Sequence, residues 1–338
     1  MNKIIIRVIM IILIILVCSC EIFELPGVNL MEVNIKKEDA AGLMQDFIIG
    51  ISEYAKALKP GFLIIPQNGS ELVFKNAKSA PYLDSYIDAI DGLGIEELFY
   101  NSNGNQINDK SRIQILTDLK KNKNLPVLVS DYLREDSITT SIQKNKDAGF
   151  IAYPRNKDNY HYSFILPISS WQGLGMVSSG SIQNLSDAKN YLYLISDENY
   201  LTKTSMLNAI KNTVYDVIII DLFYNNTAFT LDEIKRIQTK SDDVTKRLVI
   251  AYINVGAAET FRYYWSEWKN PPFLVKRYFG YPDEYWAGYW TPEWQKLIFN
   301  NGNAKDLNDK SYIKKIIDAG FDGAYLDNVE AYMEIFEK

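Results

Sequence analysis

The chain has 338 residues, a formal net charge of −6, one histidine (His161) and two cysteines (Cys18 and Cys20). A single histidine excludes most Ser-His-Asp and Cys-His catalytic sites and multi-ligand zinc sites. The acidic balance, with no basic stripe, argues against nucleic acid as a partner. Carboxylates, amides, tyrosine and tryptophan remain in quantity, and they are the groups of sugar chemistry. We expect no metal and no cofactor.

The N-terminus is similar to the targeting segment of a bacterial lipoprotein. Lys3 and Arg7 precede an apolar run, residues 8–17, that is too short to span a bilayer comfortably. The run ends in Leu-Val-Cys-Ser-Cys, which resembles a lipobox, whose final cysteine is acylated after cleavage. An uncleaved membrane anchor is the alternative. We expect an extracytoplasmic protein held on a bacterial membrane by lipid, with a signal peptide at 1–19, lipidation of Cys20 and a tether at 20–38.

Helical and strand patterns then alternate along the chain. Residues 39–58 place Leu43, Phe47 and Ile51 on one face, which predicts an amphipathic helix, and 111–121 and 230–239 have a similar pattern. Such alternation predicts a mostly parallel sheet, and eight repeats favour a single (β/α)8 TIM barrel over residues 39–338. An open doubly wound sheet is the alternative. The predicted strands are Phe62–Pro66, Glu97–Tyr100, Pro126–Ser130, Gly149–Tyr153, Tyr191–Ile195, Asp216–Ile220, Leu248–Ile253 and Asp322–Leu326.

Carboxylates or amides occur at the ends of most predicted strands. The carboxyl ends of barrel strands share one face, so these side chains should form a polar cup. One such residue alone would be a helix cap, and capping the next helix is the alternative role for Asp327. The residues are Gln67, Asn68, Glu96, Glu97, Asp131, Asp221, Asn254, Asp327 and Asn328.

Five stretches together resemble the family 114 glycoside hydrolases, the endo-α-1,4-polygalactosaminidases. Residues 251–268 hold a Tyr-containing strand followed by Gly-x-x-Glu and Arg-x-x-Trp, and residues 290–295 read Trp-x-x-x-Trp-Gln. Residues 320–328 contain Asp-Gly-x-x-x-Asp. Residues 65–69 and 91–100 supply the Gln-Asn and Gly-x-Glu strands. Each piece is weak alone, whereas the combination is specific.

The order of these motifs differs from that of the family. In relatives, the Gln-Asn and Gly-x-Glu strands follow the Asp-Gly-x-x-x-Asp strand, whereas here they precede it. We therefore interpret the chain as circularly permuted, which a closed barrel tolerates because its termini lie close together. Residues 39–154 would correspond to the family's C-terminal half, 155–190 to a linker, and 191–338 to its N-terminal half. His161 falls in this linker and is expected to be a surface or packing residue.

The resemblance implies two catalytic carboxylates, as glycoside hydrolysis requires. The family's nucleophile corresponds to Asp327 and its acid/base to Glu96. Glu96 is flanked by Ile95 and by Glu97, an apolar neighbourhood with one like charge, which is compatible with a raised pKa. Glu97 is the alternative acid. Asp322, at the opposite end of its strand, is expected to be structural.

Further residues are expected to bind the sugar. An acidic cup formed by Asp221, Glu259 and Asp131 would suit a cationic sugar such as galactosamine. Tryptophans between Phe261 and Trp294 offer flat faces, although most of them are expected to pack the loop. The other predicted substrate-binding residues are Tyr252, Asn254, Arg262, Asn68, Asn328, Tyr289 and Trp290.

The predicted function is therefore that of a metal-independent glycosidase acting on an extracytoplasmic amino-sugar polysaccharide. We expect a monomer that binds a polysaccharide or oligosaccharide and contacts the membrane through its lipid. One departure favours an alternative, a non-catalytic glycan-binding lipoprotein. Many relatives carry Gly-Glu-Ala-Glu where this chain has Ala257 in place of the first glutamate.

Overall fold

The computed structural model describes residues 28–167, 174–268 and 271–337. The predicted signal peptide and Cys20 lie outside these residues. Within them, no helix combines the length and the apolar character needed to cross a membrane.

The core is built from parallel strands in two sheets. One sheet has five strands in the order β1-β13-β9-β6-β5, and the other has three in the order β2-β3-β4. Their bounds are β1 (Leu63–Pro66), β2 (Leu93–Glu96), β3 (Val127–Leu133), β4 (Ile151–Asn156), β5 (Tyr191–Leu194), β6 (Val217–Asp221), β9 (Leu248–Asn254) and β13 (Gly323–Asp327). Except at the ends of a few strands, the residues of these strands are buried, as expected where both faces of a sheet are covered.

Smaller elements lie beside these sheets. A hairpin joins β7 (Phe223–Tyr224) to β8 (Thr227–Ala228). An antiparallel sheet has the order β10-β12-β11, with bounds β10 (Ala257–Glu259), β11 (Leu274–Arg277) and β12 (Glu284–Ala287). This sheet follows β9 directly and carries two glutamates, Glu259 and Glu284, in register with one another.

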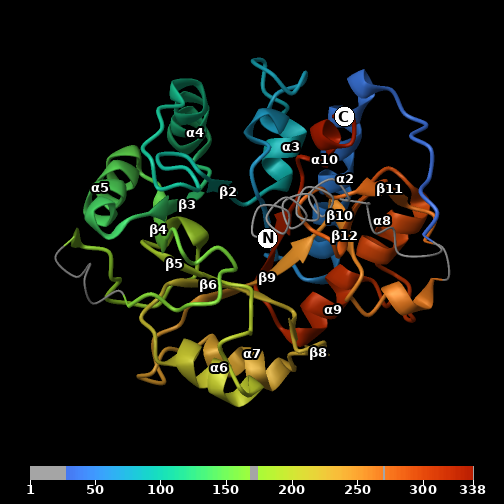
Figure 1. Ribbon diagram of the computed structural model, residues 1–338. Helices are drawn as coiled ribbons and strands as arrows, with labels where there is room; N and C mark the ends of the chain where they lie inside the picture. The colour runs from blue at the N-terminus through green and yellow to red at the C-terminus, as the bar shows by residue number, and fades with distance from the viewer. Residues whose placement is uncertain (1–27, 168–173, 269–270, 338) are drawn as a thin grey trace, which may run out of the picture.

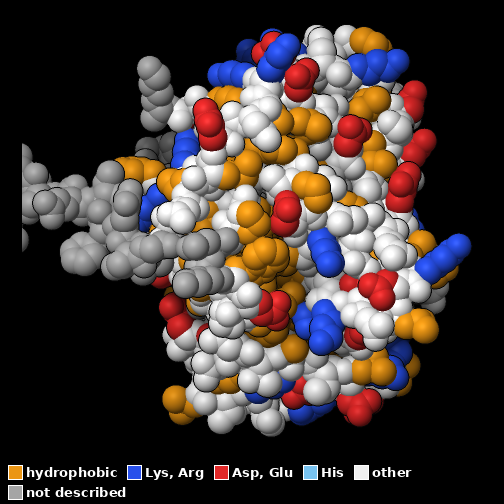
Figure 2. Space-filling model, turned by 90° about the vertical axis from the view of Figure 1, so that its right-hand side faces the viewer, with side chains coloured by type: hydrophobic (Ala, Val, Ile, Leu, Met, Phe, Trp, Pro, Cys, Tyr) orange, Lys and Arg blue, Asp and Glu red, His pale blue; other side chains and the backbone are white. Residues whose placement is uncertain are grey.

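Helices lie around the outside of the strands (Figure 1). They are α2 (Lys37–Leu58), α3 (Asp84–Ala89), α4 (Lys110–Lys123), α5 (Ile138–Ala148), α6 (Lys203–Lys211), α7 (Leu231–Ile237), α8 (Pro292–Phe299), α9 (Tyr312–Ala319) and α10 (Ala331–Glu334). Short 3-10 helices are η1 (Ser70–Val73), η2 (Glu135–Ser137), η4 (Leu185–Asp187), η5 (Trp265–Glu267) and η6 (Asn300–Gly302). Figure 2 shows one face of the molecule, where acidic and basic side chains are interspersed around hydrophobic ones.

The architecture is thus a mixed α/β fold with parallel strands, which confirms the predicted fold class at that level. The described ladders do not join into one closed sheet. In the part of the chain that the structure describes, the two parallel sheets are joined by single parallel bridges, Gln67 with Gly94 and Ala152 with Asn190.

Most predicted elements occur where the sequence places them. The helix predicted at 39–58 is α2, and Phe47, Ile51 and Tyr54 on its apolar face are buried. The helices predicted at 111–121 and 230–239 are α4 and α7, with ends shifted by a few residues. Seven of the eight predicted strands overlap an observed parallel strand.

The strand predicted at Glu97–Tyr100 is wrong, because β2 lies just before it and ends on Glu96. Glu97 has a φ of 52°, in the left-handed region, which breaks an extended strand. The next three amides, Leu98 to Tyr100, donate to Asp131 Oδ1 at 2.9, 2.9 and 3.2 Å instead of to a neighbouring strand. Gly94 weakens the strand signal of β2, yet a Cβ there would overlap the Tyr325 hydroxyl.

The first and last parts of the described chain lie side by side. β1 pairs in parallel with β13, with Leu63 opposite Gly323. Helix α10 packs against α2, and in Figure 1 the red end of the chain lies beside the blue helix. Elements from the two halves of the chain therefore share one core.

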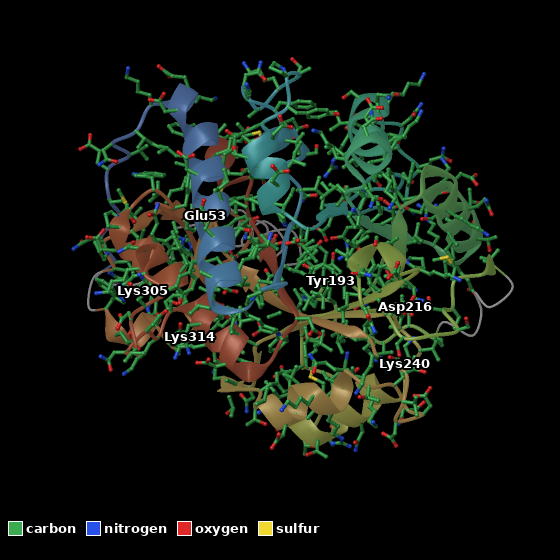
Figure 3. The ribbon with its side chains drawn as sticks, turned by 180° about the vertical axis from the view of Figure 1, so that it is seen from behind. Glu53, Tyr193, Asp216, Lys240, Lys305 and Lys314 are labelled. Atoms are coloured by element: carbon green, nitrogen blue, oxygen red, sulfur yellow. The ribbon has the colours of Figure 1, made fainter. Side chains whose placement is uncertain are left out.

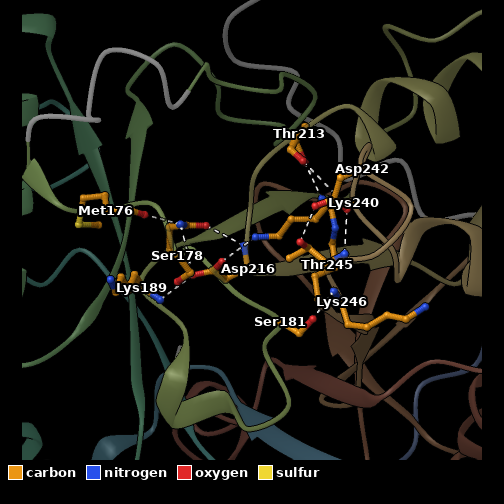
Figure 4. A network of polar contacts seen from close by, with 12 residues as sticks. Met176, Ser178, Ser181, Lys189, Thr213, Asp216, Lys240, Asp242, Thr245 and Lys246 are labelled. Carbon is orange, nitrogen blue, oxygen red and sulfur yellow. Dashed lines mark hydrogen bonds and ion pairs between the residues drawn. The ribbon is translucent and has the colours of Figure 1, made fainter.

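Buried polar groups hold the amino ends of the strands. Asp216, just before β6, accepts from Lys240 Nζ at 3.0 Å, the Ser178 hydroxyl at 2.6 Å and the Lys189 backbone N–H at 2.9 Å (Figure 4). These contacts attach residues 178–190 to the sheet. Asp322 acts similarly before β13, where it accepts from the Val249 N–H at 2.9 Å, so its predicted structural place is confirmed.

Loss of the Asp216 carboxylate should leave a buried, unpaired Lys240. Both side chains are almost fully buried, so Asp216→Ala should lower the free energy of unfolding by about 3–5 kcal/mol, measured by urea denaturation. The matched control is Asp318→Ala, which removes a 2.6 Å pair with Lys314 whose carboxylate is 60% exposed. This exposed pair should cost less than about 1 kcal/mol. Equal losses in the two variants would contradict the structural role of Asp216.

Candidate active site

A cavity of about 450 Å³ opens where the parallel strands of both sheets end. Tyr193 on β5 lines this cavity. In Figure 3 it lies in the middle of the molecule, whereas the labelled Glu53, Lys305 and Lys314 lie on the outside. Eight predicted site residues line the cavity: Asp327, Glu96, Asp221, Tyr252, Glu259, Arg262, Asn68 and Asn328. The structure therefore brings together residues from distant parts of the chain.

Glu96, the last residue of β2, faces this cavity with its side chain 22% exposed. The Tyr162 hydroxyl donates to Glu96 Oε1, and Arg155 Nη2 lies 3.4 Å from the same oxygen. Burial raises the pKa of Glu96 to about 7, against the opposing effect of Arg155 and with a further upward contribution from Asp327. A carboxyl group with this pKa can be protonated near neutral pH, as a general acid requires.

Asp327, the last residue of β13, is held by two donors. The Tyr252 hydroxyl donates to Asp327 Oδ2 at 2.5 Å, and the Asn328 N–H donates to Oδ1 at 2.8 Å. Burial raises the pKa of Asp327, while both hydrogen bonds lower it. The helix cap of α10 is Glu330, so Asp327 does not cap that helix.

Arg262 connects two further carboxylates of the cavity. Its Nη1 and Nη2 donate to the two oxygens of Asp221 at 2.9 and 2.7 Å. Its Nε and Nη2 donate to Glu259 at 2.6 and 3.2 Å. Arg262 is 7% exposed, so this is a buried network in which one cation is shared by two anions.

Six carboxylates line the cavity, and two of them were not predicted, Glu284 and Glu330. Burial raises the pKa of Glu284, and the nearby charges of Glu259 and Asp327 raise it further. No group of three or more histidine, cysteine or acidic side chains in the described ranges is arranged to hold a metal ion. The excess of carboxylates gives the cavity an acidic character.

The aromatic lining differs from the expectation. It consists of Phe261 and seven tyrosines, namely Tyr132, Tyr160, Tyr162, Tyr193, Tyr252, Tyr278 and Tyr281, and His161 lies exposed beside them. No tryptophan of the described residues lines this cavity. Trp294, for example, is fully buried and donates from Nε1 to the Val255 carbonyl at 2.8 Å. The long loop uses its tryptophans for packing, as expected for most of them.

Four predicted binding residues do not line the cavity, contrary to the prediction. Asp131 is buried and accepts the amides after β2, as described above, while Asn254 accepts the Ala257 N–H at 2.8 Å and so shapes the turn into β10. Tyr289 is buried in the core, where its hydroxyl donates to the Ala40 carbonyl at 2.8 Å. Trp290 packs edge-on against Tyr289 and donates to Asn34 Oδ1 at 2.9 Å.

The missed residues had weak sequence signals. Arg155 lies just beyond the predicted fourth strand, Gly149–Tyr153, whereas β4 runs through Asn156 and takes in the first two residues of the predicted linker. A cation at the carboxyl end of a buried strand could have been recognised as facing a carboxylate. Glu284 could be recognised as a site residue only from the pairing of β10 with β12, which places it opposite Glu259.

Buried carboxylates surrounded by tyrosine rings at the carboxyl ends of parallel strands are typical of a site that handles sugars. Residues 187–338 match the model of glycoside-hydrolase family GH114. The resemblance to this family is thus confirmed for that part of the chain.

Three relatives are similar to parts of the chain, and each is called uncharacterized. One from Methanocaldococcus jannaschii is 32% identical over 46% of this chain and 44% of its own length. One from Thermotoga maritima is 35% identical over 25% of this chain and 23% of its own. One from Deinococcus radiodurans is 28% identical over 37% of each. The chain spans less than half the length of these relatives, and no solved structure matches it significantly.

The raised pKa of Glu96 should make stability depend on pH. The folded protein holds the Glu96 proton more tightly than the unfolded chain does. This stabilisation is therefore complete at low pH and is lost as the pH rises through about 7. Glu96→Gln cannot titrate. Its free energy of unfolding relative to wild type should rise by about 2–3 kcal/mol between pH 5 and pH 8, measured by urea denaturation.

Asn122→Ala is the matched control, since this exposed amide on α4 does not titrate and does not line the cavity. Its difference from wild type should be nearly the same at both pH values. A Glu96→Gln difference that also stays constant between pH 5 and pH 8 would contradict a raised pKa at this residue.

Proposed function

We propose that the protein is a glycosidase that cleaves an amino-sugar polysaccharide, with Glu96 as acid/base and Asp327 as nucleophile. The observation that carries this assignment is the meeting of these two carboxylates in one cavity. They end strands of two different sheets and come from opposite parts of the chain. Their environments also differ. Glu96 has a pKa of about 7, whereas two hydrogen-bond donors stabilise the ionised form of Asp327 against the effect of burial.

The contacts of each carboxylate suit its proposed role. The Tyr162 hydroxyl donates to Glu96 Oε1, which leaves Oε2 to carry the proton that passes to the glycosidic oxygen. As the bond to the leaving sugar breaks, positive charge develops at the anomeric carbon. Asp327 is oriented by Tyr252 and the Asn328 N–H, and its negative charge stabilises the positive charge at the anomeric carbon. The reaction so described uses neither a metal nor a cofactor.

The charge of the cavity supports a cationic sugar as substrate. Of the six carboxyl groups that face this space, Arg262 neutralises Asp221 and Glu259 by direct contact, and Arg155 lies beside Glu96. Burial favours the neutral form of Glu284, which leaves Asp327 and Glu330 without an ion pair among the described residues. A protonated amino group of a sugar such as galactosamine would form charge-assisted hydrogen bonds there. The tyrosine rings supply flat apolar surfaces for the pyranose rings and hydroxyl groups for their edges.

We further propose that the eight parallel strands form a permuted (β/α)8 barrel over residues 39–338. The two single bridges support this, because each lies between neighbouring edges of the two parallel sheets. The pairing of β1 with β13 supports the permutation. So does the family match, which covers 187–338, close to the range 191–338 assigned to the family's N-terminal half. Residues 39–154 would then be the C-terminal half, joined by the linker at 155–190.

The sequence of the N-terminus also supports a proposed location. The lipobox-like stretch ending at Cys20 would place the enzyme outside the cytoplasm, on a lipid anchor followed by the tether at 20–38. We propose that it acts there as a monomer, since a complete barrel would need no partner to close it.

Asp327→Asn should abolish cleavage of poly-α-1,4-galactosamine, because an amide cannot act as the nucleophile. The measurement is the appearance of new reducing ends, with circular dichroism to show that the variant is folded. Asp318→Asn is the matched control, since Asp318 is 60% exposed on α9 and pairs with Lys314. Undiminished turnover in Asp327→Asn would refute the assignment.

Glu96→Gln separates the enzyme from the alternative, a glycan-binding protein. Loss of the general acid should lower kcat by about 10²–10⁴-fold, while binding of the polymer, measured by calorimetry, should survive. A wild-type protein that binds the polymer yet releases no reducing ends over long incubations would favour the binding protein. The substitution of Ala257 for the family's glutamate is the observation that supports this alternative.

A further inference from the structure

Arg155 is a buried cation at the end of β4, immediately behind the lining of the cavity. Its side chain has no exposed surface. The guanidinium carbon lies 3.3 Å from the ring centroid of Tyr132 and 3.9 Å from that of Tyr162. Both tyrosines line the cavity. Stacking between two rings fixes the plane of the guanidinium group while leaving its N–H edge free to donate.

The donors of Arg155 are unfilled. Within the described residues, Nε, Nη1 and Nη2 are all buried without a hydrogen-bond partner. The one charge partner is Glu96, whose Oε1 lies 3.4 Å from Nη2, beyond an ordinary charge-assisted hydrogen bond. A buried cation with empty donors is costly, because it has lost its water without a full replacement. Arg155 is therefore a buried cation whose hydrogen-bond donors lack a full set of acceptors.

Several charged and titratable groups act on Glu96 from the surrounding elements. Arg155 is the cation among those that contribute most, while Asp327, Glu97 and Glu330 are anions that oppose ionisation. The hydroxyl groups around it belong to Tyr132, Tyr162, Tyr191, Tyr193 and Tyr325. When Glu96 becomes a carboxylate, Arg155 is the group placed to compensate the new charge.

We propose that Arg155 is a positioning residue that receives the Glu96 carboxylate each time Glu96 gives up its proton. This role rests on the proposed function, in which the Glu96 proton forms the O–H bond of the leaving sugar while the glycosidic C–O bond breaks. The anion left behind shortens its contact with Arg155 into a hydrogen bond. Glu96 then regains a proton from water, and the contact lengthens again. Arg155 keeps its own proton throughout.

The test is a direct titration of Glu96 that needs no substrate. Protein labelled with ¹³C at the glutamate carboxyl carbon is titrated by NMR, and the Glu96 signal is assigned by its absence in Glu96→Gln. In Arg155→Met the midpoint should rise by at least about one pH unit, because the ionised form loses its cation. If Arg155→Met does not fold, Arg155→Gln replaces it with a neutral side chain of similar length.

Arg112→Met is the matched control. Arg112 also contacts Glu96, but through the backbone carbonyl, to which its Nη1 donates at 3.1 Å. Its loss should move the midpoint by less than a third of the Arg155→Met shift. An unmoved midpoint in a folded Arg155 variant overturns the proposal even if the wild type cleaves glycans. A raised midpoint supports it even if the amino-sugar polymer proves to be the wrong substrate.

In an active preparation the same substitution should also shift the pH profile of kcat/KM. The alkaline limb, which reports loss of the acid form of Glu96, should move upward with the NMR midpoint. A merely structural role for Arg155 would lower activity at all pH values without moving this limb.

Discussion

The cavity depends on the buried guanidinium group of Arg262. It bonds both oxygens of Asp221, at the end of β6, and both oxygens of Glu259, on β10, and so fixes the loop after β9 against the strand ends. Without this cation, six carboxylates around one small space would repel one another, and several would be protonated. Two of them are paired with Arg262, while burial raises the pKa values of Glu284, Glu96 and Asp327. At Asp327 the hydrogen bonds from Tyr252 and the Asn328 N–H oppose this effect, so the two proposed catalytic carboxyl groups have different surroundings, as the roles of acid and nucleophile require.

Charged side chains have different tasks at the two ends of the strands. At the amino ends, Asp216 and Asp322 have several donors each and attach loops to the sheet. At the carboxyl ends, Glu96 and Arg155 form a longer contact with unfilled donors. Satisfied groups contribute stability, whereas incompletely paired groups cost stability and are retained where chemistry uses them. In this cavity the incompletely paired charge is Arg155, which lies beside the proposed acid Glu96.

The sequence predicted most elements well, because hydrophobic periodicity is a local signal. Strand-end carboxylates are also a local signal, and Glu96 and Asp327, which were expected in one cup, both line the cavity. It failed where a long-range contact decided the outcome. Asp131 resembled a cup residue, yet it accepts three amides after Glu97 and thereby ends β2 early. The site was predicted to use tryptophan, but strand ends from both sheets bring tyrosines together, a result that no single stretch of sequence contains. Arg155 and Glu284 were missed for the same reason, because the role of each depends on a partner residue on another strand.

The pairing of β1 with β13 has a consequence for biogenesis. During synthesis β1 and α2 emerge well before their neighbours β13 and α10. Until β13 and α10 are made, one edge of β1 has no ladder partner from β13, and the apolar side of α2 lacks part of its cover. Contacts of such long sequence separation form slowly, so this part of the core is completed only after β13 has been synthesised. In the interval the open edge of β1 and the apolar side of α2 are accessible to chaperones and proteases.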